Sequence, residues 1–280
     1  MKVFISADIE GVTGVVTWGQ TGGPRSEHYD WPHARKMMTH DVNAAVRGAR
    51  SAGATRVVVK DSHGGGKNLL VPELEDNVEL ISGSGSGVLG MMEGVDGGFD
   101  CAFLVGYHGM AGTAAGIMEH TISGIVHRYW INDVPSGEIA MSVSTAGVLG
   151  VPVVMVSSDK AGCTEASSVV SGLHTAVVKE GLGRYMGRLL HPSETGPLIE
   201  KAAEAAVSGA SSIKPWTAAE PTVVKIEFNR TEECDAACQM PGWARLDAYT
   251  IEFTADDWPT AHIATRRAMA MGGTGAGNNR

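Results

Sequence analysis

The sequence predicts an α/β fold, a doubly wound and largely parallel sheet followed by a C-terminal α+β subdomain. In the first half of the chain, short β-branched runs alternate with helical stretches, which is typical of parallel strands covered on both faces. The 280 residues are 43% apolar and 19% charged, which excludes a disordered chain, and the 37 glycines indicate many tight turns. Together these observations indicate a folded enzyme-like chain.

Residues 1–160 are expected to form the α/β domain. Apolar residues from Met38 to Ala49 recur at helical spacing, and Gly53 follows as a stop. A second helix is predicted after Gly137. The candidate strands are Lys2–Ala7, Arg56–Lys60, Val78–Ile81, Ala102–Val105 and Val153–Val156.

Residues 161–270 are expected to form the α+β subdomain, because polar and apolar residues alternate there as in half-buried strands. Residues 271–280 are rich in glycine and asparagine, which predicts a flexible tail. The predicted elements are a helix that Pro197 opens, a polar linker at 215–221, strands at 224–228 and 249–253, and a last helix from Asp257.

Composition and charge exclude several classes of partner. The balance of 22 basic and 31 acidic residues, with no basic stripe, argues against nucleic acid. No apolar run approaches the ~18 residues of a membrane helix, and Asp8 interrupts the first strand too early for a secretory segment, so we expect a cytoplasmic protein and no membrane partner. Cys234 and Cys238 lack a second Cys/His pair at zinc-finger spacing, so they are interpreted as helix-side thiols.

Polar side chains follow three of the predicted strands. Asp8 and Glu10 come after the first strand and are two residues apart, so both carboxylates leave on the same side. His63 follows the second strand and His108 the fourth. Because ligands of an open α/β sheet bind outside the carboxyl ends of its strands, these four side chains are expected to meet. Two neighbouring buried carboxylates then require a cation or a proton.

The mixture of imidazole and carboxylate favours zinc, manganese, cobalt or iron over magnesium. Glu138, in the first turn of the helix after Gly137, adds a third carboxylate. Two histidines and three carboxylates exceed the needs of one tetrahedral zinc, which leaves room for two ions sharing a bridging water. Taken singly, each residue has an ordinary alternative, as a capping or turn histidine, a solvated loop carboxylate or a helix-dipole partner.

His120 is the candidate for proton transfer, because a water attacking a carbonyl needs a group that titrates near neutrality beside it. Spacing alone fits a buried structural histidine equally well. Asp61 is a candidate to hydrogen-bond and orient a ligand histidine. The other seven histidines lie in predicted helices or loops without such neighbours and are interpreted as structural or exposed.

Five ordered motifs resemble the zinc-dependent D-aminopeptidases of the DppA type, which are encoded in bacterial dipeptide-transport operons. The similarity runs from residue 1 to about residue 270. The motifs are Ser-Ala-Asp-Ile-Glu-Gly at 6–11, Asp-Ser-His at 61–63, Gly-Tyr-His at 106–108, Met-Glu-His at 118–120 and Ile-Asn-Asp-Val-Pro-Ser-Gly-Glu at 131–138.

The resemblance implies a function and a set of roles. Family members release D-amino acids from the N-terminus of short peptides such as D-Ala-D-Ala, and they form homodecamers of two stacked pentameric rings. The resemblance makes His120 the catalytic nucleophile or base. It makes the ligands of two zinc ions, with cobalt or manganese as substitutes, Asp8, Glu10, His63, His108 and Glu138.

Three other functions stay open. The same site fits a hydrolase of another amide or of a phosphoester, and a catalytically silent protein that keeps metal for folding. A nucleotide-binding protein is a further alternative, because residues 85–90 match the Gly-x-Gly-x-x-Gly fingerprint. That segment follows the third strand rather than the first, and residues 91–94 make a poor start to a long helix, so its glycines are assigned to a flexible connection.

Overall fold

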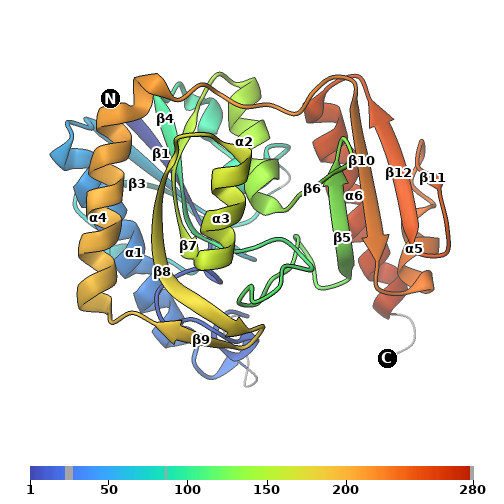
Figure 1. Ribbon diagram of the computed structural model, residues 1–280, viewed down its shortest axis with the longest axis horizontal. Helices are drawn as coiled ribbons and strands as arrows, with labels where there is room; N and C mark the ends of the chain where they lie inside the picture. Colours follow the sequence, from blue (N-terminus) through green and yellow to red (C-terminus); the bar gives the residue numbers. More distant parts are fainter. Residues whose placement is uncertain (23–27, 86, 278–280) are drawn as a thin grey trace.

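Two β-sheets organise the computed structural model, which describes residues 1–22, 28–85 and 87–277 (Figure 1). The first sheet has seven strands in the order β3-β2-β1-β4-β7-β8-β9, and its neighbours pair in parallel except β8 with β9. The predicted α/β fold with a largely parallel sheet is confirmed. The strands are β1 (Lys2–Ala7), β2 (Arg56–Asp61), β3 (Glu79–Ile81), β4 (Cys101–Tyr107), β7 (Val153–Asp159), β8 (His174–Gly183) and β9 (Met186–Leu189).

Helices cover both faces of this sheet. Helices α1 (Trp31–Ser51) and α4 (Pro192–Gly209) pack side by side on one face, and α2 (Glu138–Val148) and α3 (Lys160–Val169) cover the other (Figure 1). Every residue of the central strands β4 and β7 is buried. Continuous burial is what a strand covered on both faces requires, and it explains the unbroken apolar runs in these segments.

The strand order reverses between β1 and β4. From β1 the chain moves to β2 and β3 on one side, and from β4 it moves to β7 and β8 on the other. Strands β1 and β4 pair in register from Val3 with Cys101 to Ala7 with Val105, so they end at the same level. This switch point is the place where open α/β sheets bind ligands.

The second sheet is antiparallel, with the strand order β11-β12-β10-β5-β6, and stands beside the first, at the right of Figure 1. Helices α5 (Thr231–Ala237) and α6 (Trp258–Gly277) pack together against it. The strands are β5 (Val126–Ile131), β6 (Val134–Pro135), β10 (Thr222–Phe228), β11 (Ala244–Arg245) and β12 (Thr250–Ala255).

Helix α2 is shared between the two hydrophobic cores. Its Ile139 and Val143 belong to the core of the first sheet, whereas Ala140 and Met141 belong to the core of the second. Trp258 of α6 donates a hydrogen bond from Nε1 to the hydroxyl of Thr145 at 3.0 Å. Glu138 therefore begins a helix that is fixed from both sides.

The structure differs from the sequence prediction in how the chain is divided. Strands β8 and β9 and helix α4 continue the first sheet and its cover well beyond residue 160, and the second sheet takes β5 and β6 from residues 126–135. The second sheet is therefore built from both halves of the chain. Helix α4 begins at Pro192 and not at the predicted Pro197, which lies inside the helix. A proline is tolerated at the first helical position because the N–H that it lacks has no partner within the helix.

The C-terminal segment is a helix through Gly277 rather than a tail from residue 271; residues 278–280 lie outside the described residues. A Cβ on Gly272 would lie 2.7 Å from Phe228, and one on Gly275 would lie 2.2 Å from the carbonyl oxygen of Glu232. These glycines let α6 pack closely against β10 and α5. A glycine-rich composition by itself does not distinguish such a packed helix from a flexible tail.

None of the helices in the described residues combines the length and apolarity needed to cross a lipid bilayer. Short 3-10 helices complete the connections between the longer elements. The 3-10 helices are η1 (Trp18–Gln20), η3 (Val71–Glu73), η4 (Gly90–Met92), η5 (Val95–Gly97) and η6 (Ala210–Ser212).

Candidate metal centre

Four side chains meet where β1, β2 and β4 end, and Asp8, Glu10 and His108 among them are buried. The Oδ1 of Asp8 lies 3.2 Å from Nδ1 of His63, and its Oδ2 lies 3.5 Å from Nε2 of His108. Glu10 extends the group, because its Oε2 lies 3.1 Å from the same nitrogen of His63. The structure therefore brings together the four residues whose meeting the strand ends predicted.

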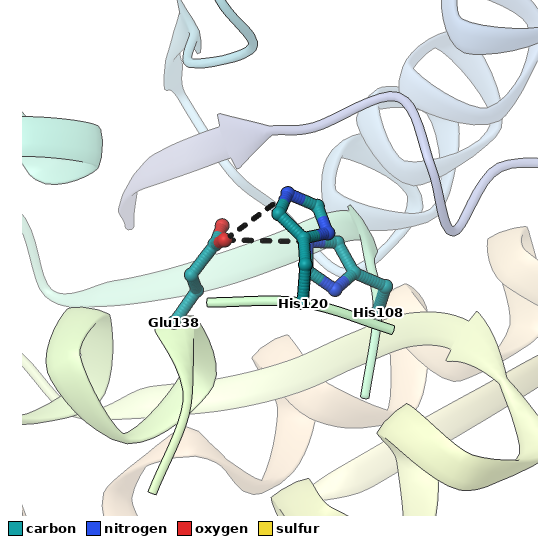
Figure 2. Close-up of side chains that lie close together, drawn as sticks. All are labelled: His108, His120 and Glu138. Atoms are coloured by element: carbon teal, nitrogen blue, oxygen red, sulfur yellow. Dashed lines mark ion pairs between the residues drawn. The ribbon is translucent and has the colours of Figure 1, made fainter. Parts of the chain in front are cut away.

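Glu138 and His120 lie beside His108 and complete the cluster, and Figure 2 shows these three side chains pointing toward one another. The Oε1 of Glu138, at the first residue of α2, lies 3.4 Å from Nε2 of His108 and 3.6 Å from Nε2 of His120. The rings of His108 and His120 stack with centroids 4.1 Å apart and planes 10° apart. All six residues singled out in the sequence thus lie in one place.

Each imidazole is oriented by a backbone carbonyl. Nε2 of His63 is 2.8 Å from the oxygen of Thr21, Nδ1 of His108 is 3.0 Å from that of Gly109, and Nδ1 of His120 is 2.9 Å from that of Met118. Because a carbonyl oxygen only accepts, these nitrogens carry the hydrogen. In a neutral ring the other nitrogen presents its lone pair to the carboxylates, as metal-ligating histidines do.

Several polar atoms of the cluster lack a hydrogen bond. Both carboxylate oxygens of Glu10 and Nε2 of His108 are buried and have no such partner in the described part of the chain, although ion-pair distances link them to their neighbours. Two sets of ligand atoms lie within 4.8 Å of one another, Asp8 with Glu10 and His108, and His108 with His120 and Glu138. Carboxylates and imidazoles at this spacing fit zinc.

The charge state of the cluster also calls for a cation. Burial and the neighbouring Glu10 carboxylate raise the pKa of Asp8 to about 7. Although burial alone would lower them, the carboxylates hold the pKa values of His63 and His108 well above the ordinary range. Burial and the charge of His108 instead lower the pKa of His120. Asp8 and Glu138 each accept one backbone hydrogen bond, from Ile9 and Ile122, and the remaining negative charge is balanced by protons on neighbouring groups, a balance that a metal ion would also supply.

A cavity of about 570 Å³ opens beside the cluster, within the size range of small-molecule sites. Gly85 and Gly87 of the Gly-x-Gly-x-x-Gly segment line it, whereas Ser86 lies outside the described residues. Gly90 begins the short η4 turn, and no α-helix starts there in the part of the chain that the structure describes. The nucleotide-binding alternative therefore lacks the helix N-terminus that would bind a pyrophosphate.

Comparison with known proteins agrees with this geometry. A family model described as D-aminopeptidase matches residues 1–266. A D-aminopeptidase of Bacillus subtilis (strain 168) is 33% identical over 267 residues, which cover 94% of this chain and 95% of that protein. The chain belongs to the D-aminopeptidase family.

A solved structure extends the match. The Zn-dependent D-aminopeptidase DppA from Bacillus subtilis, described as a self-compartmentalizing protease, aligns with a TM-score of 0.91 at 32% identity, covering 97% of this chain and 98% of that one. The predicted family, the predicted fold and the assignment as a metal-dependent peptide hydrolase are confirmed.

Asp61 has a different role from the one expected. Its carboxylate accepts hydrogen bonds from the backbone and side-chain nitrogens of Asn68 at 2.6 and 2.9 Å and from the backbone of Leu69 at 2.8 Å. The side chain of Asn68 in turn donates to the carbonyl of His63. The prediction that Asp61 orients a ligand ring was wrong, because the glycine turn after His63 brings Asn68 back onto this carboxylate.

Two buried ionisable residues that support the site of this D-aminopeptidase family member were not found in the sequence. The ammonium of Lys179, on β8, donates to the carbonyl oxygens of Glu10, Val12 and Val15 at 2.5, 2.8 and 2.6 Å. Glu165, on α3, accepts a hydrogen bond from the backbone of Met110 at 2.7 Å. A lysine directly after the apolar run 176–178 was a usable signal for Lys179, whereas nothing in the sequence distinguishes Glu165.

Proposed function

We propose that this chain is a dinuclear zinc aminopeptidase that releases N-terminal D-amino acids from short peptides of the D-Ala-D-Ala type. The observation that carries the proposal is the pair of ligand sets that share His108 beside the cavity. The solved relative is described as Zn-dependent, and the curated relative as a D-aminopeptidase. The residues proposed to hold the two ions are Asp8, Glu10, His63, His108 and Glu138.

Zinc held by these groups would supply Lewis-acid activation of the scissile carbonyl and of the attacking water. His120 is the proposed proton carrier. Its Nδ1–H is fixed by the carbonyl of Met118, so Nε2 is available to take a proton from water and pass it to the departing amine. The edge-on Trp18 ring, with centroids 5.1 Å apart, and the stacked His108 ring hold its plane.

The substrate amino group is proposed to bind among the carboxylates of the same cluster. Glu10 has two oxygens without a hydrogen bond to any described residue, and both Glu10 and Glu138 line the cavity. A free amine held there would fix the first peptide bond beside Nε2 of His120. This arrangement explains a restriction to the N-terminal residue.

The experiment that tests the proposal combines elemental analysis with a parallel assay of D-Ala-D-Ala, L-Ala-L-Ala and a generic phosphodiester. We expect two zinc ions per chain and hydrolysis of the D-dipeptide, with slower turnover of the L-dipeptide and none of the phosphodiester. Faster cleavage of the phosphodiester would instead favour a phosphoesterase, and bound metal without any hydrolysis would favour a catalytically silent protein.

The assembly and the location are part of the proposal. Because the solved relative is described as self-compartmentalizing, we propose that the chain forms a homodecamer, and light scattering should then give ten times the 29.2 kDa of one chain. We also propose a cytoplasmic location, because the four cysteines are free thiols, as is usual in a reducing compartment.

A further inference from the structure

The cavity that adjoins the metal cluster also contains a group of basic side chains, which we call the basic group: Lys60, His262 and Arg266. Lys60 lies on β2, whereas His262 and Arg266 lie four residues apart on α6 and therefore share one face of that helix. Neither helix residue is near the metal ligands in sequence. A strand of the first sheet and the helix that packs on the second sheet therefore both place hydrogen-bond donors in this cavity.

His262 is a buried polar side chain of α6. It is 5% exposed, its ring contacts Trp258 with centroids 5.4 Å apart, and neither ring nitrogen has a hydrogen-bond partner among the described residues. Burial and the charge of Arg266 lower the pKa of His262 to about 4, so the ring is neutral and one nitrogen donates. A buried unpaired group costs stability, which a ligand would offset.

The two cations also keep donors for a ligand. The ammonium of Lys60, which is 6% exposed, donates to the carbonyls of Asp61 and Gly83, which leaves one of its three N–H groups. Arg266 donates from Nη1 to the carbonyl of Gly87 at 3.0 Å and has four further N–H groups. Because both residues line the cavity, these donors are available to an anion there.

Two carboxylates lie near the cations of the basic group. Glu93 also lines the cavity, and its Oε2 accepts a hydrogen bond from the backbone of Leu89 at 3.0 Å. The carboxylates of Glu93 and Asp61 both act on the charge of Lys60, so the unused N–H donors, rather than a net positive charge, favour an anion here. A Cβ on Gly90, whose φ is +65°, would lie 3.0 Å from Nε2 of His262, so a glycine there lets the η4 turn approach α6.

We propose that Lys60, His262 and Arg266 bind the C-terminal carboxylate of the peptide substrate. The inference rests on the proposed aminopeptidase function, because the metal cluster must hold the scissile bond in the same cavity. A carboxylate matches the available donors, which are a planar guanidinium, an ammonium and a neutral imidazole. With the amino end held by the cluster and the carboxyl end by the basic group, the cavity selects short peptides with a free carboxyl terminus.

The test compares D-Ala-D-Ala with its C-terminal amide on the zinc-loaded protein and on two variants. Arg266→Gln should raise KM for the free acid about 10- to 100-fold, the effect of losing a hydrogen bond to a charged group, and should leave KM for the amide nearly unchanged. Arg267→Gln, on the same helix but exposed and outside the cavity lining, should change neither. Arg266→Lys, which keeps the charge, should give an intermediate KM.

A second measurement does not depend on turnover. Calorimetric titration of D-Ala-D-Ala and of its C-terminal amide into the metal-free wild type should show that the amide binds more weakly than the free acid. Arg266→Gln should abolish this difference in affinity. Equal kcat/KM for acid and amide in the wild type would overturn the inference, as would tight binding of inorganic phosphate with no discrimination between the two peptides. If the aminopeptidase function itself is wrong, neither peptide is cleaved by any variant, which is a different result.

Discussion

At the scale of single residues, the two sets of ligand atoms separate His108, which is proposed to bind metal, from His120, which is proposed to carry a proton. His108 belongs to both sets of ligand atoms, whereas His120 belongs to one and lines the cavity. Nδ1 of each ring is bonded to a backbone carbonyl oxygen, whereas Nε2 of His108 lies beside both Asp8 and Glu138, and Nε2 of His120 lies beside Glu138. The two roles are therefore separable by substitution.

His120→Ala should keep two zinc ions per chain and lose about 10²- to 10⁴-fold in kcat, the usual contribution of acid–base catalysis. His108→Ala should lose both metal and turnover, because it removes a group common to both ligand sets. Metal content by elemental analysis and kcat on D-Ala-D-Ala check the pair. His127→Ala, at an exposed position of β5, is the control and should match the wild type. Near-normal turnover of His120→Ala would remove its assigned role.

A pH dependence of stability follows from His40. A hydrogen bond of 2.9 Å to the buried Asp41 carboxylate raises the pKa of this histidine above 6.5. The stabilisation is therefore fully present below pH 6.5 and is lost as the pH rises through the raised pKa. Urea unfolding should show His40→Gln about 0.5–1 kcal/mol less stable than wild type at pH 5.5, with a smaller difference at pH 8.5. A difference that does not change with pH would contradict this assignment.

At the scale of secondary-structure elements, the loop after β1 depends on a strand far away in sequence. Lys179 on β8 is 1% exposed, and its ammonium is bonded to three carbonyls of the loop that carries Glu10. Burial lowers the pKa of Lys179 to about 8, which leaves the ammonium mostly charged at neutral pH. The lysine therefore fixes this loop together with the backbone hydrogen bond from Gly11 to the carbonyl of Gly106 on β4, which is 2.8 Å long.

Lys179→Met should destabilise the protein by on the order of 3 kcal/mol, because three buried carbonyls lose their donor. It should also weaken zinc binding, since Glu10 is no longer held at the cluster. Denaturant unfolding and zinc titration of the purified variant measure the two effects. Lys201→Met, at an exposed position of α4, should show neither. Unchanged zinc affinity in Lys179→Met would limit the lysine to a role in stability.

The contact between α1 and α4 offers another test at this scale. A Cβ on Gly48 would lie 2.1 Å from the carbonyl oxygen of Glu200, so only glycine lets the helices approach this closely. Gly48→Ala should cost about 1–3 kcal/mol through overpacking, against the gain in helix propensity that alanine usually brings. Ser51→Ala, at the exposed end of the same helix, should be neutral or slightly stabilising in thermal unfolding. A stabilised Gly48→Ala variant would show that the helices can separate at no cost.

The sequence was informative where one local pattern decides the structure. Strand β1 has the predicted bounds, and β2, β4 and β7 extend the predicted runs by a few residues, because each is buried on both faces. Strand β8 was missed, since its partly exposed residues mix buried and open positions without a clean period. The strand ends located the cluster, whereas Lys179 and His262 reach the site through contacts between distant segments that no local pattern encodes.

At the scale of the whole molecule, the hairpin of β8 and β9 links an exposed apolar surface to the site. The backbone of Met118 donates to the carbonyl of Arg184 at 2.8 Å, and Trp18, which contacts His120, donates from Nε1 to the hydroxyl of Tyr185 at 3.0 Å. Exposed apolar side chains concentrate on this hairpin, at Leu182, Tyr185, Met186 and Leu189. Because the chain is proposed to assemble, we expect these exposed apolar side chains to lie at an interface between copies.

The double variant Leu182→Glu and Met186→Glu should therefore reduce the assembly to smaller species, because it places charges in the proposed interface. Turnover should fall with it, since the hairpin holds the segment that carries His120, while zinc content stays unchanged. Light scattering and kcat on D-Ala-D-Ala, measured on the same preparation, test both effects. Val71→Glu, which is 63% exposed in the wild type and far from the hairpin in sequence, is the matched control. An intact assembly with full activity would place the interface elsewhere on the surface.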